Sequence, residues 1–107
     1  MAVITINEAN YKKEIEESTM PIIIDIYASW CPPCQNMAPV FDELEKEMGS
    51  SYKFAKINVD EARELSVKLG ATSIPTFVFI KGGEVKGREV GQVDKEELRG
   101  KIKEFLG

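Results

Sequence analysis

One segment, residues 22–28, limits the possible folds of this 107-residue sequence more than any other. It reads Ile-Ile-Ile-Asp-Ile-Tyr-Ala, which is nearly all apolar and rich in β-branched side chains. That composition is typical of a central strand that is buried on both faces of its sheet. Helices must then cover both sides of the sheet, so the sequence predicts an α/β fold.

Hydrophobic periodicity predicts further strands at residues 3–6, 52–59, 76–80 and 84–90. The Gly82-Gly83 pair indicates a hairpin before the last of these, which is polar enough to be an antiparallel edge strand. Helical patterns separate the other strands. The resulting order βαβαβαββα predicts a mixed five-stranded sheet that is flanked by four helices.

The ends of the predicted helices are marked by capping residues. Asn7 suits the N-cap of a helix to about residue 17, and Asp60 is expected to cap the third helix. The second helix carries its apolar residues on one face and ends at Gly49. Asp94 and Glu97 form a capping box for the last helix.

The composition is typical of a single compact domain over residues 1–107. Hydrophobic residues make up 43% of the chain, which is enough for a core. A formal net charge of −4 gives no electrostatic reason to bind nucleic acid or an anionic membrane. No apolar run approaches the roughly 18 residues that span a bilayer, and the N-terminus does not resemble a signal peptide. We therefore expect a cytoplasmic protein with no membrane or nucleic-acid partner.

The sequence contains no histidine. This excludes a Ser-His-Asp triad, Cys-His proteolysis, imidazole zinc sites and axial histidine ligation of haem. The chemistry must then depend on Cys, Asp, Glu, Lys or Tyr side chains.

The most informative motif is Trp30-Cys31-Pro32-Pro33-Cys34, at the junction between the buried strand and the second helix. Each proline disfavours helical backbone in the residue before it, so Cys31 and Pro32 are expected to be extended. Pro33 then suits the first helical position. This spacing predicts a Cα–Cα separation within the range of roughly 4.4–6.8 Å that a disulfide accepts.

A helix N-terminus favours a thiolate through its unpaired N–H groups and its partial positive charge. Cys31 is therefore the expected nucleophile, with a pKa below the free value. Cys34 lies further into the helix, and it is the expected resolving thiol that attacks the mixed disulfide formed through Cys31.

Three other interpretations of the cysteine pair remain open. A structural disulfide is one, although a bridge that closes so short a loop stabilises little. Half of a zinc site is another, but its remaining ligands would have to come from a second chain. Haem attachment requires a histidine after the second cysteine, where this sequence has Gln35.

Asp25 is the second unusual feature, because it interrupts the apolar run six residues before Cys31. One interpretation is that Asp25 lies at a solvated end of the sheet or pairs with a lysine. The other is that it is buried and has a raised pKa. If it is buried, it can exchange a proton with Cys34 through a water. Lys56, on a strand expected alongside, is the candidate countercharge.

The third feature is Ile74-Pro75-Thr76, immediately before a buried-type strand. A proline at that place is ordinarily a strand-start residue. The alternative is a cis peptide bond that brings a turn against the cysteines.

Together these residues resemble the thioredoxin family over essentially the whole chain. The resemblance rests on residues in the family's order and spacing: Asp25, Trp30, Cys31, Pro33, Cys34, Pro39, Lys56, Asp60, Ile74, Pro75, Thr76, Gly83 and Gly91. It implies the thioredoxin fold, a kink at Pro39, and a cis Ile74-Pro75 bond that faces the cysteines. It also implies an apolar surface that docks extended substrate segments through backbone hydrogen bonds, formed by Trp30, Pro33, Ile74, Pro75 and Gly91.

The resemblance further implies a protein-disulfide reductase that carries no metal or bound organic cofactor. We expect it to be monomeric, with weak dimers through an exposed patch at Trp30 and Pro75 as the alternative. Oxidised proteins would be its substrates, and an NADPH-linked or ferredoxin-linked reductase would restore its dithiol. An oxidase or isomerase is a rival, disfavoured by the missing signal segment and the missing histidine between the cysteines. A binding module that uses the surface around Trp30 and Pro75 is a rival of another class.

The sequence departs from the family's usual pattern at three positions near the cysteines. Pro32 replaces glycine, Gln35 replaces lysine, and Tyr27 stands where tryptophan is frequent. Pro32 removes an N–H donor beside Cys31 and stiffens the turn, and Gln35 removes a cation. We therefore expect a stronger reductant than an ordinary thioredoxin, whose potential is about −270 mV.

Overall fold

The computed structural model describes residues 2–107. Within them, the strands are β1 (Ile4–Thr5), β2 (Ile22–Tyr27), β3 (Lys53–Asn58), β4 (Thr76–Lys81) and β5 (Glu84–Val90). The helices are η1 (Lys12–Glu16), α1 (Pro32–Met48), α2 (Arg63–Lys68) and α3 (Lys95–Leu106). Five strands and four helices in this order confirm the predicted βαβαβαββα arrangement for the described residues. None of these helices is long and apolar enough to cross a membrane.

The strands form one mixed sheet in the order β1-β3-β2-β4-β5. Strands β1, β3 and β2 run parallel, whereas β4 is antiparallel to β2 and β5 is antiparallel to β4. β2 therefore lies in the centre, and its first five residues are all buried, as the apolar run predicted. β5 is a largely exposed edge strand, which confirms the prediction from its polar sequence.

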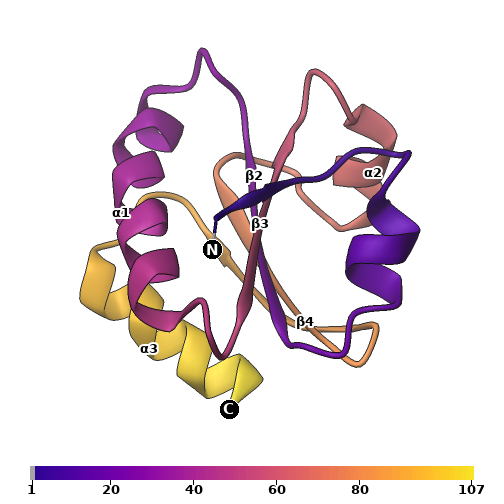
Figure 1. Ribbon diagram of the computed structural model, residues 1–107. Coiled ribbons are helices and arrows are strands. Elements are labelled where there is room, and N and C mark those ends of the chain that lie inside the picture. Colours follow the sequence, from indigo (N-terminus) through magenta and orange to yellow (C-terminus); the bar gives the residue numbers. More distant parts are fainter. Residues whose placement is uncertain (1) are drawn as a thin grey trace.

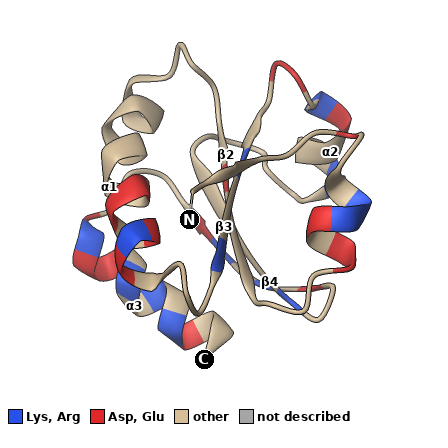
Figure 2. Cartoon of the chain, viewed as in Figure 1, with Lys and Arg blue, Asp and Glu red and all other residues tan. Residues whose placement is uncertain are grey.

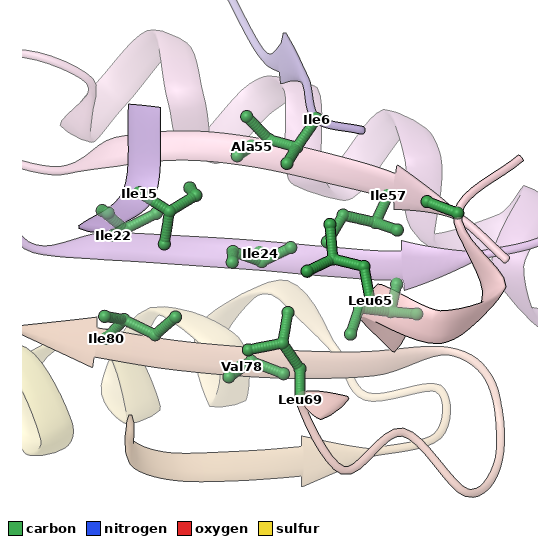
Figure 3. Packing of buried hydrophobic residues seen from close by; sticks show 12 residues of the cluster. Ile6, Ile15, Ile22, Ile24, Ala55, Ile57, Leu65, Leu69, Val78 and Ile80 are labelled. Carbon is green, nitrogen blue, oxygen red and sulfur yellow. The ribbon is translucent and has the colours of Figure 1, made fainter. Parts of the chain in front are cut away.

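Helices cover the sheet on both faces, with α1 and α3 on one side and η1 and α2 on the other (Figure 1). Alternate residues of β2 point to opposite sides because side chains alternate along a strand. Ile22, Ile24 and Ile26 join the core beneath η1 and α2, part of which is seen in Figure 3. Ile23 joins the core beneath α1 and α3. Asp25 shares the face of Ile23, so the one acidic residue of β2 lies on the α1 side of the sheet.

The N-terminal segment is less regular than predicted. The strand expected at residues 3–6 is assigned only at Ile4–Thr5, and the helix expected from Asn7 is a short π-helix at Lys12–Glu16. The Asn7 carboxamide accepts hydrogen bonds from the N–H groups of Ala9 and Asn10, at 2.9 and 3.3 Å. Asn7 therefore stabilises a turn, as its side chain favours, and the helix begins only after that turn.

The capping predictions had different outcomes at α2 and α3. The N-cap of α2 is Ala62, with no side-chain cap, so the prediction that Asp60 caps this helix is wrong. The Asp60 carboxylate instead accepts a hydrogen bond from the indole N–H of Trp30 at 2.8 Å. At α3 the Asp94 carboxylate accepts the Glu97 N–H at 2.8 Å, which confirms Asp94 as the N-cap.

Candidate active site

The site begins where β2 gives way to α1. Cys31 is the N-cap of α1, with extended backbone at φ −96° and ψ 111°. Pro32 is already the first helical residue, so the prediction that it is extended is wrong. The first residues of a helix have no intrahelical partner for their N–H groups, and two successive prolines therefore fit there.

Cys31 and Cys34 form a disulfide, with a Cα–Cα distance of 5.2 Å inside the predicted range. Because Pro32 and Pro33 lack N–H groups, the first N–H of α1 belongs to Cys34, and it donates to the Cys31 sulfur at 3.3 Å. Both cysteines are buried, with exposed fractions of 4% and 3%. Exposure therefore does not distinguish the two sulfurs in the oxidised protein.

The loop before the disulfide is held on two sides. Trp30 is 65% exposed, and its indole N–H is bonded to Asp60 in the loop between β3 and α2. The Gln35 side-chain amide donates to the Ser29 carbonyl oxygen at 2.7 Å. The sequence predicted that Asp60 caps α2 and did not predict its contact with Trp30, because a contact between two loops leaves no local sequence pattern.

The Ile74-Pro75 peptide bond is cis, as the resemblance implied. Ile74 packs against the two cysteines. The Pro75 carbonyl oxygen accepts the N–H of Gly91 at 2.8 Å, and Gly91 has a φ of +92° that favours glycine. Of the predicted docking residues, Trp30 and Pro33 are exposed, Ile74 and Gly91 are partly buried, and Pro75 is buried.

Asp25 lies behind the disulfide and is only 5% exposed. Its Oδ1 atom has no hydrogen-bond partner, so the interpretation that it lies at a solvated end of the sheet is wrong. It is level with Lys56 in the pairing of β2 with β3, and the two alternate to the same face of the sheet. Burial raises the pKa of Asp25 to about 7, against the opposing charge of Lys56 and with a smaller contribution from Asp42.

A cavity of about 100 Å³ connects Asp25 with the disulfide. Its walls include Asp25, Tyr27, Cys34, Ala38, Asp42 and Lys56. Asp42 was missed from the sequence, although its spacing offered a signal: Ala38 and Asp42 follow Cys34 by four and eight residues, which places all three on one side of a helix. Cys34 lines this cavity whereas Cys31 does not, and this contact is what distinguishes the two sulfurs.

Metal binding finds no support at this site. Across residues 2–107, no group of three or more Cys, Asp or Glu side chains lies close enough together to hold a metal ion. Both cysteines are committed to the disulfide.

Comparison with known proteins places this arrangement among its relatives. A family model described as Thioredoxin matches residues 2–104. Thioredoxin H4 of Arabidopsis thaliana is 47% identical over 92 residues, which are 86% of this chain and 76% of that protein. The thioredoxin of Haemophilus influenzae is 38% identical over 104 residues, 97% of each chain. An M-type chloroplastic thioredoxin of Spinacia oleracea is 39% identical over 101 residues, 94% of this chain and 56% of that one.

The matches and the cysteine pair lead to the same chemistry. A disulfide at the start of a helix, in a chain that aligns with thioredoxins over nearly its full length, is a redox-active centre that works without a bound cofactor. It supports thiol–disulfide oxidoreductase activity that reduces protein disulfides and depends on a separate reductase. On the agreement of fold, cysteine spacing and relatives, the chain belongs to the thioredoxin family.

Proposed function

We propose that Cys31 is the attacking thiol and Cys34 the resolving thiol of this disulfide reductase. The Cys31 thiolate attacks a substrate disulfide, forms a mixed disulfide and releases one substrate thiolate, which takes a proton from solvent. Cys34 then loses its proton and attacks the Cys31 sulfur, so that the Cys31–Cys34 bond forms and the second substrate thiolate leaves. Two electrons pass to the substrate, and the protein ends as the disulfide.

The observation that carries this assignment is the contact of Cys34 with the cavity that holds Asp25. The buried carboxylate has a pKa near 7, so it can accept a proton from Cys34 at neutral pH. Cys31 caps the helix and does not line the cavity that holds Asp25. We therefore propose that Asp25 is the proton acceptor for Cys34, through a water, and that the Lys56 ammonium opposes the rise in the Asp25 pKa.

Replacing Asp25 by asparagine should slow the second step and leave the first step unchanged. The expected loss is roughly 10²-fold at pH 8, because the variant lacks a base beside Cys34. The two steps separate when the reduced protein reacts with an aromatic disulfide such as dithiobis(nitrobenzoate), which releases one coloured thiol in each step. In the unmodified protein the second release should accelerate as the pH rises through about 7, the pKa of Asp25. An Asp25→Asn variant that kept this acceleration would contradict the assignment.

We propose that Trp30, Pro33, Ile74, Pro75 and Gly91 form the surface that docks extended segments of oxidised proteins. The exposed indole and the exposed Pro33 ring lie beside the disulfide, and Ile74 packs against it. Residues 26–41 contain no charged side chain, and the segment that leads from β2 into α1 is correspondingly tan in Figure 2, although the neighbouring loop between β3 and α2 is acidic. Apolar contact and backbone hydrogen bonds, rather than ion pairs, would then recognise a substrate on that side.

Pro32 should make the disulfide harder to reduce. Because Pro32 and Pro33 have no N–H groups, the Cys34 N–H is the donor from the first turn of α1 that reaches the Cys31 sulfur. One further donor to a thiolate would favour the reduced form by about 1.5 kcal/mol, which is roughly 30 mV for a two-electron couple. We therefore predict that Pro32→Gly raises the potential by roughly 30 mV, measured by equilibration with a glutathione couple.

Pro32→Ala is the matched control for this prediction, since alanine restores the N–H group without the flexibility of glycine. A rise in both variants assigns the effect to the donor, and a rise in the glycine variant alone assigns it to stiffness. An unchanged or lowered potential in both variants would refute the proposed role of Pro32.

We also propose that the dithiol is restored by an NADPH-linked or ferredoxin-linked reductase, and that the protein acts in the cytoplasm as an electron carrier. The similarity to chloroplastic relatives such as the spinach M-type protein is the reason for including the ferredoxin-linked reductase as a candidate. The two routes are separated by supplying each purified reductase in turn and following reduction of the Cys31–Cys34 disulfide.

A further inference from the structure

A side chain from β5 holds the end of α2. The N–H groups of Gly70 and Ala71 bond back to carbonyl oxygens in the last turn of α2, at 2.9 and 3.0 Å, and Gly70 has a φ of +83°. This glycine-dependent helix end satisfies two of the last carbonyl oxygens but not that of Leu69. The Nε–H group of Arg88 donates to the Leu69 oxygen at 2.8 Å, so β5 supplies the partner that the helix lacks.

The Arg88 guanidinium group also lies against Gly70. A Cβ atom at Gly70 would come within 2.8 to 2.9 Å of Nε, Cζ and Nη2 of Arg88, so a side chain there would have to displace the guanidinium group. Arg88 is paired with Val78 of β4, and it therefore points to the side of the sheet that η1 and α2 cover. Leu69 and Val78 belong to the core on that side, which Figure 3 shows. Arg88 thus reaches from an exposed edge strand to the end of α2.

The segment that follows α2, residues 70–75, is called the docking loop here because it carries Ile74 and Pro75. Ile74 packs against the two cysteines, whereas the middle of the loop is exposed. Contacts from one end of β5 hold the loop on both sides. Arg88 bonds to the carbonyl group just before the loop, and three residues later the N–H of Gly91 bonds to the Pro75 carbonyl oxygen at 2.8 Å. The position of the docking loop over the disulfide therefore depends on β5.

We propose that Arg88 is a positioning residue for the docking of protein substrates. By holding the start of the docking loop, it keeps Ile74 and Pro75 in the place where they meet an extended segment of an oxidised protein. The inference rests on the proposed docking surface, and it adds a residue outside that surface on which the geometry of the surface depends. A protein substrate that docks on the loop is sensitive to Arg88, whereas a small disulfide that reacts at Cys31 without docking is not.

Arg88→Ala should raise the KM for insulin severalfold at a fixed concentration of reductant, with kcat nearly unchanged. Loss of a hydrogen bond to a charged group changes an equilibrium by roughly tenfold or more. We expect a smaller rise because Gly91 still holds the other end of the docking loop. The first thiol release from dithiobis(nitrobenzoate) should keep the parent rate. Lys86→Ala is the matched control, because it removes an exposed cation of β5 that pairs with Glu84 at 3.2 Å, and it should leave the KM unchanged.

Trp30→Ala, which alters the docking surface itself, separates this inference from the proposed function. If Trp30→Ala raises the KM for insulin and Arg88→Ala does not, the role of Arg88 is overturned and the docking surface stands. If neither variant raises the KM, both proposals fail. A rise in Arg88→Ala alone would support the inference and exclude the indole from the surface. An equal rise in Lys86→Ala, or a slower first release in Arg88→Ala, would assign the effect to net charge or to a general loss of structure and would overturn the inference.

Discussion

Replacing Cys31 by serine should abolish disulfide reduction, whereas replacing Cys34 by serine should leave one attack intact and stop the reaction at the mixed disulfide. The serine hydroxyl does not ionise near neutral pH, so Cys31→Ser lacks the thiolate that begins the reaction. Cys34→Ser keeps that thiolate at the helix N-terminus but has no second thiol to resolve the product. Insulin reduction measures the loss in both variants, and mass spectrometry detects the mixed disulfide.

The pair of variants also distinguishes a reductase from a binding module. A module that merely used the surface around Trp30 would keep its partner affinity in Cys31→Ser and would show no covalent product in Cys34→Ser. Trapping through Cys31 in the second variant alone would support the order of attack. Trapping by Cys31→Ser alone would reverse the two roles, since Cys34 would then be the thiol that substrates reach, and equal trapping by both variants would contradict a fixed order of attack.

Replacing Asp25 by asparagine should raise the free energy of unfolding above neutral pH. The pKa of Asp25 is raised from 3.8 to about 7 by burial, so the folded protein binds more protons than the unfolded chain between these values. Its ionisation therefore costs stability progressively as the pH rises from about 4 to 7, and the full cost persists above 7. A difference of roughly three pKa units corresponds to about 4 kcal/mol as an upper bound. The amide carries no charge and avoids most of this cost.

Denaturant unfolding of the oxidised proteins at pH 8 and at pH 4 measures the effect. The stabilisation by Asp25→Asn should be largest at pH 8 and should be small at pH 4, where the folded aspartate is protonated and the unfolded one, with a pKa of 3.8, is only about half ionised. Glu8→Gln removes one acidic charge at an exposed turn and should change little at either pH. An Asp25→Asn variant that was less stable at pH 8 than at pH 4, relative to the parent, would show that the carboxylate is stabilised in the fold.

The parts of the fold that sequence predicts well are those where one physical requirement dominates. The apolar run of β2 requires burial on both faces of the sheet, and the apolar residues of α1 form one stripe along a helix. Both elements were therefore predicted close to their observed bounds. The helix after Asn7 was mispredicted because a side-chain turn competes with helical hydrogen bonds there. Asp60 was mispredicted because aspartate suits several local roles, and contact with a distant tryptophan decided among them.

In the candidate site, too, the sequence predicts the local features and not those that depend on how distant segments pack. The cysteines are three residues apart, so helix geometry alone predicted that they could bond. Asp25 and Lys56 belong to different strands, and their common face depends on the register of β2 with β3, which the spacing of either strand does not determine. The cavity depends on the packing of α1 against the sheet. It therefore lies beyond any argument from local pattern.

The alternation of β2 has a consequence for engineering this protein. Ile22, Ile24 and Ile26 belong to a core whose buried members do not line the cavity, whereas Ile23 and Asp25 face α1. Repacking beneath η1 and α2 can therefore adjust thermal tolerance without changing the cavity wall, provided that Val59 and Ile74, which pack against both this core and the cysteines, are kept. A change of volume beneath α1, at Phe41 in particular, alters both at once, because that ring belongs to the core and to the cavity wall. One strand thus divides the interior into a side whose buried residues leave the cavity wall unchanged and a side whose residues shape it.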